Sequence, residues 1–138
     1  IPKEAYLEID LRDTSTDTRD AALGRIQEQI RAICEKRNIE YEVKVLNCDS
    51  PAICDEGLVE IAVAACDELK LTHKKMVSRA YHDSLFIAQL FPTTMLFIPC
   101  REGVSHRPDE YSSPEQIKKG VEALALTMAK LSLSENSK

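Results

Sequence analysis

The stretch TTMLFIPCREGVSHRPDEYSSPEQIKKG, residues 93–120, contains the pattern that decides the fold class of this chain. Its apolar start, residues 93–100, has the length of a strand buried on both faces, and Pro99 would end that strand. A polar loop follows, after which Ser113 and Gln116 have the spacing of a capping box at the start of a helix. A buried strand that leads through a loop into a helix is typical of an α/β fold.

Helical patterns flank this stretch on both sides. Upstream, residues 58–69 repeat apolar side chains at the spacing of an amphipathic helix, and residues 82–90 read as a shorter helix. Downstream, the last helix carries an apolar stripe that we expect to be buried. The residues of that stripe are Ile117, Val121, Leu124, Met128 and Leu131. One strand among these helices is too few for a complete sheet.

The first part of the chain has the pattern of a strand–helix–strand unit. KEAYLEIDLRD, residues 3–13, and NIEYEVKVLN, residues 38–47, alternate between apolar and polar side chains as half-buried strands do. Between them, TSTD supplies capping residues for a helix that continues to about Arg37. This unit predicts a small α+β layer.

A break near residue 50 divides the chain into two parts. In CDSPAICD, residues 48–55, the Ser-Pro step disfavours continued regular structure. We predict one domain piece at residues 1–53 and a second at residues 54–138, and an α/β fold class overall.

Composition and charge limit the partners that the chain can have. Its 138 residues are 43% hydrophobic and 30% charged, as in a globular protein, and the formal net charge is -5. We expect no nucleic-acid and no membrane partner, because the chain is acidic, has no basic stripe and has no apolar run of membrane length. Its five cysteines lack CxxC spacing, which predicts free structural thiols rather than a zinc ribbon.

His106 is the first candidate for a chemical role. It follows the predicted buried strand, where α/β sheets place their ligands, and a neutral imidazole binds Zn²⁺, Mn²⁺ or Fe²⁺. The pattern alone favours a solvated loop histidine, because no HxH or HExxH spacing accompanies it. A Cys100 nucleophile paired with His106 is a further alternative, although nothing nearby would orient the imidazole.

His82 and Arg12 are the other two candidates, and each has a structural alternative. His82 precedes Asp83, so the pair could begin a short helix, or the imidazole could donate a hydrogen bond to a developing oxyanion. Arg12 lies on the polar face of the first predicted strand. There it could pair with Asp10 or Glu8, or it could clamp a substrate carboxylate with two hydrogen bonds.

Three blocks of the sequence together resemble a known family. IPKEAYLEIDLRD, SRAYHDSLF and MLFIPCREGVSHRPDEYSSPEQIKKG are similar, in this order, to blocks of the amidohydrolases that act on ureido and carbamoyl compounds. Those enzymes belong to the dinuclear-metal aminoacylase/carboxypeptidase superfamily. The family's usual SGAGHD block is SRAYHD here, with Arg79 and Tyr81 in place of glycines. That variant resembles the branch that acts on (S)-ureidoglycolate in ureide (purine) breakdown.

The resemblance implies a role for each candidate residue. His106, in GVSH, matches the family's C-terminal metal-binding histidine. His82, in YHD, matches the active-site histidine that contacts the substrate and helps to stabilise the tetrahedral intermediate. Arg12, in DLRD, matches the arginine that holds the substrate carboxylate. Tyr81 in place of glycine would narrow the cleft beside His82.

The resemblance also implies a fold, a cofactor and partners. Residues 1–53 would be the second half of an α+β lid, or dimerisation, domain, and residues 54–138 the C-terminal part of a zinc-peptidase-like α/β catalytic domain. The expected cofactor is a pair of Mn²⁺ ions, with Zn²⁺ as the alternative. The expected partners are a small ureido-acid substrate and a second copy of the chain, bound through the lid. Plant members imply the lumen of the endoplasmic reticulum, and otherwise we expect the cytoplasm.

The implied reaction is the metal-dependent hydrolysis of a linear C–N bond of (S)-ureidoglycolate, which yields glyoxylate, ammonia and CO₂. The family's other metal ligands and its general-base glutamate have no counterpart in this sequence. We therefore expect the chain by itself to be inactive, either as a fragment or as one of two cooperating chains. Two alternatives stay open: an allantoate or N-carbamoyl-L-amino-acid amidohydrolase, and a non-catalytic interaction module.

Overall fold

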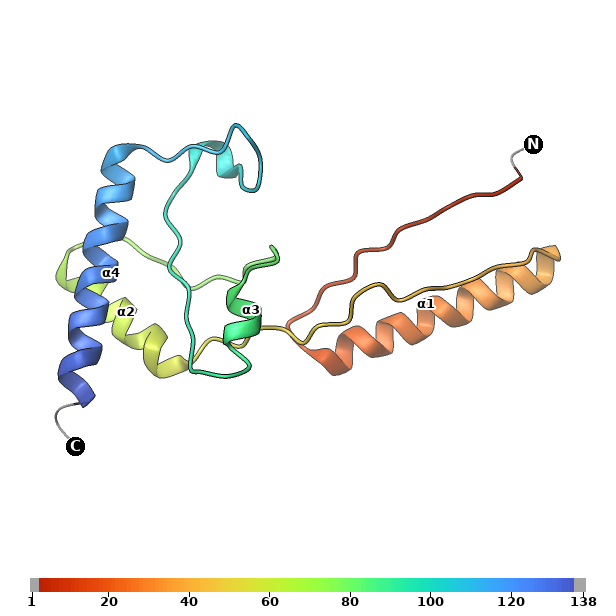
Figure 1. Cartoon of the computed structure of the whole chain (residues 1–138), viewed down its shortest axis with the longest axis horizontal. Coiled ribbons are helices and arrows are strands. Elements are labelled where there is room, and N and C mark those ends of the chain that lie inside the picture. The colour runs from red at the N-terminus through yellow and green to blue at the C-terminus, as the bar shows by residue number, and fades with distance from the viewer. Residues whose placement is uncertain (1–2, 136–138) are drawn as a thin grey trace. The chain divides into compact units, whose positions relative to one another are not determined.

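The computed structural model describes residues 3–135, which form helices joined by extended chain (Figure 1). The elements are α1 (Thr16–Arg37), α2 (Glu56–Glu68), α3 (Ser84–Ile87), the 3-10 turn η1 (Arg101–Gly103) and α4 (Pro114–Glu135). The chain divides into two compact units, Ile1–Ala52 and Ile53–Lys138. That these units are pieces of a lid and of a catalytic domain stays a prediction. Between residues 3 and 135, no helix is both long enough and apolar enough to cross a membrane.

The ends of the two long helices follow from their capping residues. At the start of α1, the Oγ atom of Ser15 accepts a hydrogen bond from the Thr18 N–H at 3.3 Å. At the start of α4, the N–H of Ser113 donates to Oε1 of Gln116 at 3.0 Å, and the N–H of Gln116 donates to Oγ of Ser113 at 3.3 Å. These two bonds are the predicted capping box. Asn38 ends α1 in the left-handed conformation that suits a helix C-terminus.

The three strands predicted from the sequence are not found among residues 3–135. Segments 3–13, 38–47 and 93–100 run as extended chain, but no hydrogen-bonded ladder joins any of them to a neighbour (Figure 1). A strand exists only where a neighbour pairs with its backbone N–H and C=O groups. The α/β prediction is therefore not confirmed in its strands, because the alternating pattern identifies extended segments without supplying a partner for them.

In the first unit, the segment after α1 folds back along the helix. The N–H of Ile39 donates to the carbonyl oxygen of Cys34 at 3.0 Å, where α1 ends. Near the start of α1, the guanidinium of Arg19 donates to the carbonyl oxygen of Asp49 at 2.5 Å and to Sγ of Cys48 at 3.2 Å. Contacts at both ends of α1 thus hold this segment beside the helix.

In the second unit, α2 packs against α4 through small side chains. Ala65 and Ala123 are buried, and the buried hydroxyl of Thr127 donates to the carbonyl oxygen of Ala123 at 2.7 Å. At the edge of this contact, the Nζ atom of Lys130 lies 2.6 Å from a carboxylate oxygen of Glu68. Small residues on both helices let their backbones approach closely, and they form the core of the unit.

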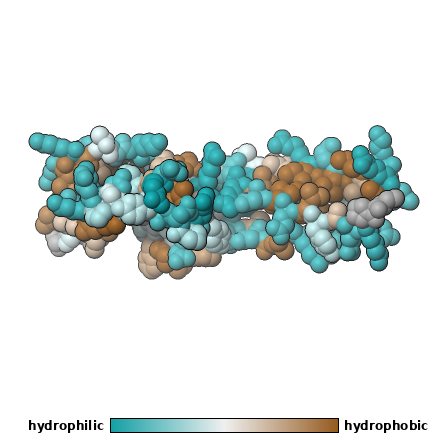
Figure 2. Space-filling model, turned by 90° about the horizontal axis from the view of Figure 1, so that it is seen from above, coloured by the Kyte–Doolittle hydropathy of each residue, from teal (hydrophilic) through white to brown (hydrophobic). Residues whose placement is uncertain are grey.

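The prediction that the large apolar stripe of α4 is buried is wrong. Four of its members are exposed, with relative accessibilities between 48% and 62%. They are Ile117, Val121, Leu124 and Met128. The face of α4 that packs against α2 instead carries Ala123 and Thr127, because small side chains allow the closer approach. Exposed large apolar side chains occur in many other parts of the chain as well, and Figure 2 shows apolar patches at the surface in brown.

Gly120 marks a close approach between α4 and the extended segment 93–100. A Cβ atom added to Gly120 would lie 2.4 Å from Cγ2 of Ile98, and this branched side chain has little freedom to move away. We expect Gly120→Ala to destabilise the protein by about 1 kcal/mol, since overpacking costs about 1–3 kcal/mol and the gain in helix propensity offsets up to about 1 kcal/mol. The midpoint of urea unfolding measures this change.

Gly24→Ala, in the middle of α1, is the matched control for Gly120→Ala. A Cβ atom added to Gly24 has nothing within 4 Å, so this variant should stabilise α1 by about 0.5–1 kcal/mol. Equal stabilisation by both variants would show that Ile98 yields to the added methyl group and that the close approach does not matter for stability.

Candidate functional site

Three groups of the second unit hold His82, which lies in the loop just before α3. The Oγ atom of Ser78 is 2.8 Å from Nε2 of the imidazole. The half-buried ring of His82 lies 5.5 Å from the ring of Phe97 and 5.7 Å from the ring of His106, measured between centroids. Asp83, at the N-cap position of α3, makes no capping hydrogen bond with its side chain. The structure thus gives no support to a helix-capping role for the His82–Asp83 pair.

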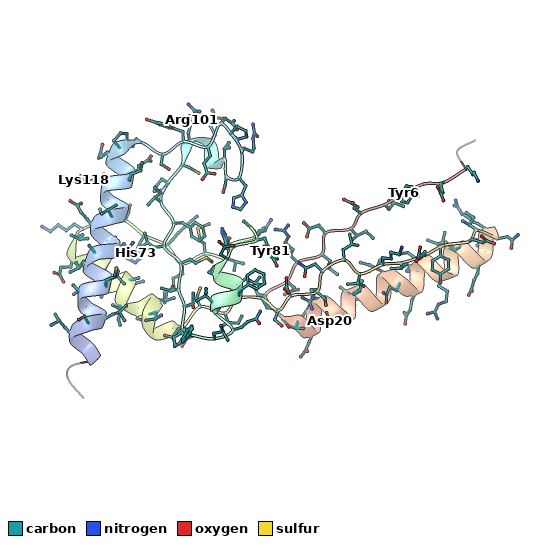
Figure 3. The ribbon with its side chains drawn as sticks, viewed as in Figure 1. Tyr6, Asp20, His73, Tyr81, Arg101 and Lys118 are labelled. Atoms are coloured by element: carbon teal, nitrogen blue, oxygen red, sulfur yellow. The ribbon has the colours of Figure 1, made fainter. Side chains whose placement is uncertain are left out.

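His106 lies in the loop between η1 and α4, and charged side chains fix the shape of that loop. Its backbone is in the left-handed region, with φ at 58°, and its N–H donates to Oε2 of Glu110 at 2.8 Å. The guanidinium of Arg107 makes two hydrogen bonds of 2.9 Å to the carboxylate of Asp109. Arg101 donates to the carbonyl oxygen of Asp109 at 3.2 Å. Figure 3 labels Arg101, the first residue of η1, and Tyr81, which precedes α3.

The structure therefore brings two of the three predicted site residues together. The planes of the His82 and His106 rings make an angle of 80°, so one ring presents its edge to the other. His82 is half-buried and hydrogen-bonded, whereas the side chain of His106 is exposed. A protected imidazole can act as a positioned hydrogen-bond donor, and an exposed imidazole can reach a metal ion or a substrate.

The residues described do not form a complete metal site. Between residues 3 and 135, no three side chains of histidine, cysteine, aspartate or glutamate lie close enough together to hold a metal ion, and all five cysteines are free thiols, as predicted. A structural or catalytic metal ion needs at least three protein ligands in most sites. These residues fit the contribution of one imidazole, or of two, to a site that other ligands complete.

Arg12, the third predicted residue, lies in the first unit and is paired with Asp10. Its Nε atom is 2.8 Å from Oδ1 of Asp10, and its Nη2 atom is 2.5 Å from Oδ2. The hydrogen bond from Arg12 holds the pKa of the Asp10 carboxyl below its ordinary value, so both groups are charged at neutral pH. This pairing is the structural alternative that the sequence left open. A clamp for a substrate carboxylate would use the same two-point geometry.

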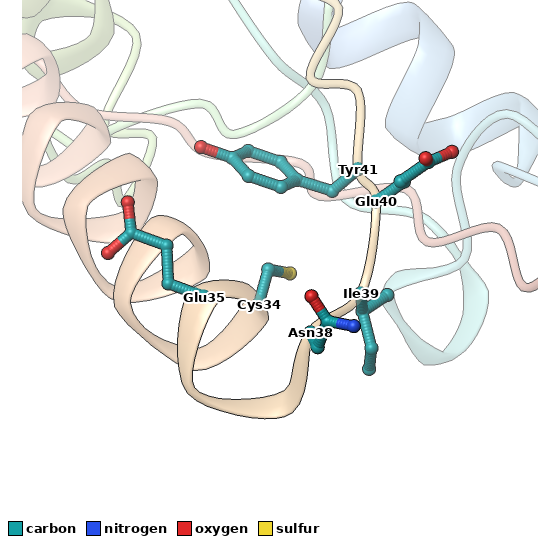
Figure 4. Close-up of a pocket in the computed structure, with 6 residues that line it drawn as sticks. All are labelled: Cys34, Glu35, Asn38, Ile39, Glu40 and Tyr41. Carbon is teal, nitrogen blue, oxygen red and sulfur yellow. The ribbon is translucent and has the colours of Figure 1, made fainter.

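A hollow near the end of α1 contains none of the three predicted residues. Its volume is about 310 Å³, and it opens to solvent beside the last turn of the helix (Figure 4). The residues that line it are Cys34, Glu35, Asn38, Ile39, Glu40 and Tyr41. Two of these side chains are acidic and the lining carries no cation, so it is a poor receptor for a carboxylate substrate.

Sequence reasoning missed two residues that contact the histidines. Ser78 binds the ring of His82 from four residues upstream, and Glu110 binds the backbone of His106 from four residues downstream. Both contacts lie within loops, where no periodic pattern shows which side chains turn toward each other. The only signal in the sequence was a polar residue within reach of each histidine.

Comparison with known proteins identifies relatives over most of the chain. Residues 3–130 match the family described as Peptidase family M20/M25/M40. Ureidoglycolate hydrolase of Arabidopsis thaliana is 48% identical over 134 residues, which are 96% of this chain, and the enzyme of the same name from Oryza sativa subsp. japonica is 42% identical over 134 residues. Allantoate amidohydrolase of Escherichia coli (strain K12) is 30% identical over 131 residues.

A solved structure of a relative is also similar to this chain in its fold. The crystal structure of AtUAH in complex with (S)-hydroxyglycine superposes on 86% of this chain with a TM-score of 0.74 and a sequence identity of 48%. The chain spans 28% of each ureidoglycolate hydrolase and 28% of that solved chain, and 32% of the allantoate amidohydrolase. The similarity thus covers nearly all of this sequence and less than a third of each relative.

Proposed function

Since this chain belongs to peptidase family M20/M25/M40, whose members depend on metal ions, we propose that it forms part of an amidohydrolase that cleaves (S)-ureidoglycolate. Its relatives with 48% and 42% identity are both ureidoglycolate hydrolases, whereas the allantoate and N-carbamoyl-L-amino-acid amidohydrolases are 29–31% identical. The complete reaction would convert one molecule of (S)-ureidoglycolate and one water molecule into glyoxylate, two molecules of ammonia and CO₂. The first bond to be hydrolysed would be a C–N bond of the ureido group.

The contact between His82 and His106 is the observation that carries this proposal. Two imidazoles from separate loops, with centroids 5.7 Å apart, lie close enough to act on the same small group. His82 would donate a hydrogen bond to the oxygen that becomes negative as water adds to the carbonyl carbon. Such a donor stabilises the transition state more than the ground state, because the charge on the oxygen develops only during the reaction.

Arg12 would hold the carboxylate of the substrate. A planar guanidinium binds a carboxylate through two parallel hydrogen bonds, and Arg12 already makes this arrangement with Asp10. Both side chains of the pair are more than half exposed, so water competes with their contact and exchange of one carboxylate for another costs little. The guanidinium would thereby hold the carboxylate end of the substrate in one orientation.

His106 would contribute one imidazole nitrogen to a metal pair whose other ligands lie outside these residues. We propose Mn²⁺, with Zn²⁺ as the alternative, and such ions supply a water activated for attack at neutral pH. We also propose the domains, the dimer and the compartment that the resemblance to this family implies. Residues 1–53 would belong to a lid that pairs two copies of the protein, residues 54–138 would belong to the catalytic domain, and the compartment would be the endoplasmic reticulum lumen or the cytoplasm.

A comparison of substrates tests the proposal. Ammonia release by the complete polypeptide would be measured with (S)-ureidoglycolate, allantoate and an N-carbamoyl-L-amino acid, each in the presence of Mn²⁺. We expect kcat/KM to be at least about 100-fold higher for (S)-ureidoglycolate, because buried polar groups that lose their partner on a wrong substrate discriminate strongly. A preference for allantoate would instead assign the protein to the allantoate amidohydrolases.

A further inference from the structure

We propose that Ser78 is a positioning residue that fixes the tautomer and the direction of the His82 imidazole. The inference rests on the proposed function, since it concerns the hydrogen bond that His82 would give to the substrate. It begins with one contact: the Oγ atom of Ser78 lies 2.8 Å from Nε2 of His82, in a partly buried position. The segment SRAYH, residues 78–82, folds back on itself to make this contact.

A second hydrogen bond favours donation from the Ser78 hydroxyl to the ring. The backbone N–H of Ala80 donates to Oγ of Ser78 at 3.3 Å, so the oxygen already accepts one hydrogen bond. A hydroxyl has one proton and can give it to Nε2 of His82. An oxygen that accepts one hydrogen bond becomes the better donor in the next, because hydrogen bonds in a chain polarise each other. On this basis the Ser78 hydroxyl would donate, and Nε2 of His82 would accept.

The tautomer of His82 follows from this direction of donation. A neutral imidazole carries one proton, and if Nε2 accepts a hydrogen bond then the proton is on Nδ1. The Nδ1–H group is then the donor available for a developing oxyanion. With the opposite tautomer, Nε2–H would donate to Ser78, and Nδ1 would offer a lone pair that repels negative charge. Ser78 therefore selects the form of His82 that can do the proposed chemistry.

Two rings restrict the remaining motion of the imidazole. The ring of Phe97 lies against His82 at 5.5 Å with an interplanar angle of 57°, and the ring of His106 meets it nearly at a right angle. Phe97 comes from the extended segment 93–100 and His106 from the loop before α4. These contacts limit the tilt of the imidazole. The hydrogen bond to Ser78 fixes the orientation of the ring about the Cβ–Cγ bond, because a flip of the ring by about 180° would break this hydrogen bond.

The experiment compares Ser78→Ala with Ser78→Thr in the complete polypeptide, with two measurements. Histidine ¹⁵N chemical shifts report the tautomer of His82, whose signals are assigned by their loss in His82→Gln. Steady-state kinetics report kcat and KM for (S)-ureidoglycolate. Ser84→Ala is the matched control, because the partly buried Ser84 hydroxyl contacts Sδ of Met95 and no histidine.

We expect the unprotonated nitrogen of His82 to be Nε2 in the unsubstituted protein and in Ser78→Thr. In Ser78→Ala, we expect a mixture of tautomers and a fall in kcat of about 10- to 100-fold, with KM little changed. Ser78→Thr should restore kcat because it keeps the hydroxyl, and Ser84→Ala should match the unsubstituted protein in both measurements.

The outcomes separate this inference from the proposed function. If the unsubstituted protein carries the His82 proton on Nε2, the inference is overturned, whether or not Ser78→Ala folds. An unchanged tautomer and kcat in Ser78→Ala would overturn it as well, while the proposed function stands. If (S)-ureidoglycolate is not hydrolysed but the ¹⁵N shifts respond as expected, the proposed function fails while the role of Ser78 in holding the ring stands.

Discussion

His106→Ala should lower the metal affinity of the complete polypeptide by at least about 100-fold and abolish most of its turnover. Loss of a group that merely orients a metal ligand costs about 10- to 100-fold in metal affinity or activity, and loss of the ligand itself should cost no less. The side chain of His106 is exposed, so few packing contacts are lost with it. Metal content per polypeptide after dialysis, measured by inductively coupled plasma mass spectrometry, checks the first effect independently of the second.

His73→Ala is the matched control for His106→Ala. His73 is the remaining histidine of the chain, and its Nδ1 atom lies 3.4 Å from the carbonyl oxygen of Leu71 and 3.6 Å from Oδ1 of Asp67. It contacts neither candidate histidine, so we expect this variant to keep its metal and its turnover. If His106→Ala also kept both, the metal role of His106 would be wrong, and a non-catalytic interaction module would become the better interpretation of the chain.

His82→Ala should lower kcat by about 100- to 1000-fold with little change in KM. This is the usual cost of removing one hydrogen-bond donor that acts on a developing oxyanion, since that interaction forms fully only in the transition state. The metal content should stay that of the unsubstituted protein, which distinguishes His82 from His106. Initial rates of ammonia release over a range of (S)-ureidoglycolate concentrations give both kinetic constants.

The division of the effect between kcat and KM is the decisive part of the His82 experiment. A rise in KM with unchanged kcat would mean that His82 binds the ground state and the transition state equally well. That result would assign His82 to substrate binding and would remove the oxyanion role. Far-ultraviolet circular dichroism of His82→Ala should match the unsubstituted protein, since the half-buried ring contributes little to the small core.

The helices were largely predictable because their signals are local. Ser113 and Gln116 form the reciprocal bonds that their spacing predicted, and Ser15 caps α1 within the TSTD segment. A capping bond involves residues only two or three positions apart, so the sequence contains both partners. The short helix α3 was also located, although it begins at Ser84, after His82 and Asp83.

The strands and the buried face of α4 depend on distant neighbours, and there the predictions failed. Alternation in residues 3–13 shows two faces of a segment but does not supply the second strand of a ladder. On α4, Ile117 and Val121 were the more hydrophobic choice for the core, yet Ala123 and Thr127 face α2. Hydrophobicity ranks side chains by the free energy of exposing them to water. The distance at which two helices can pack is set instead by the volume of the side chains between them.

The sequence named candidate site residues but not the contacts that they make. His82 and His106 are 24 positions apart, and only the fold could show that their rings meet. The pairing of Arg12 with Asp10 was one of the alternatives that the sequence offered, because side chains two positions apart on a strand lie on the same face. The roles of all three residues in binding a metal ion or a substrate remain predictions.

The left-handed backbone at His106 limits which amino acids evolution can place there, before any requirement of chemistry applies. A φ of 58° costs most residues about 1–2 kcal/mol, whereas histidine, asparagine and aspartate occupy this region more often than other side chains. All three of these also carry atoms that can coordinate a cation. A search for natural variants at this position should therefore find few residues outside this set and glycine, which occupies the region without steric cost, and His106→Asn would remove the ring while preserving the turn of the loop.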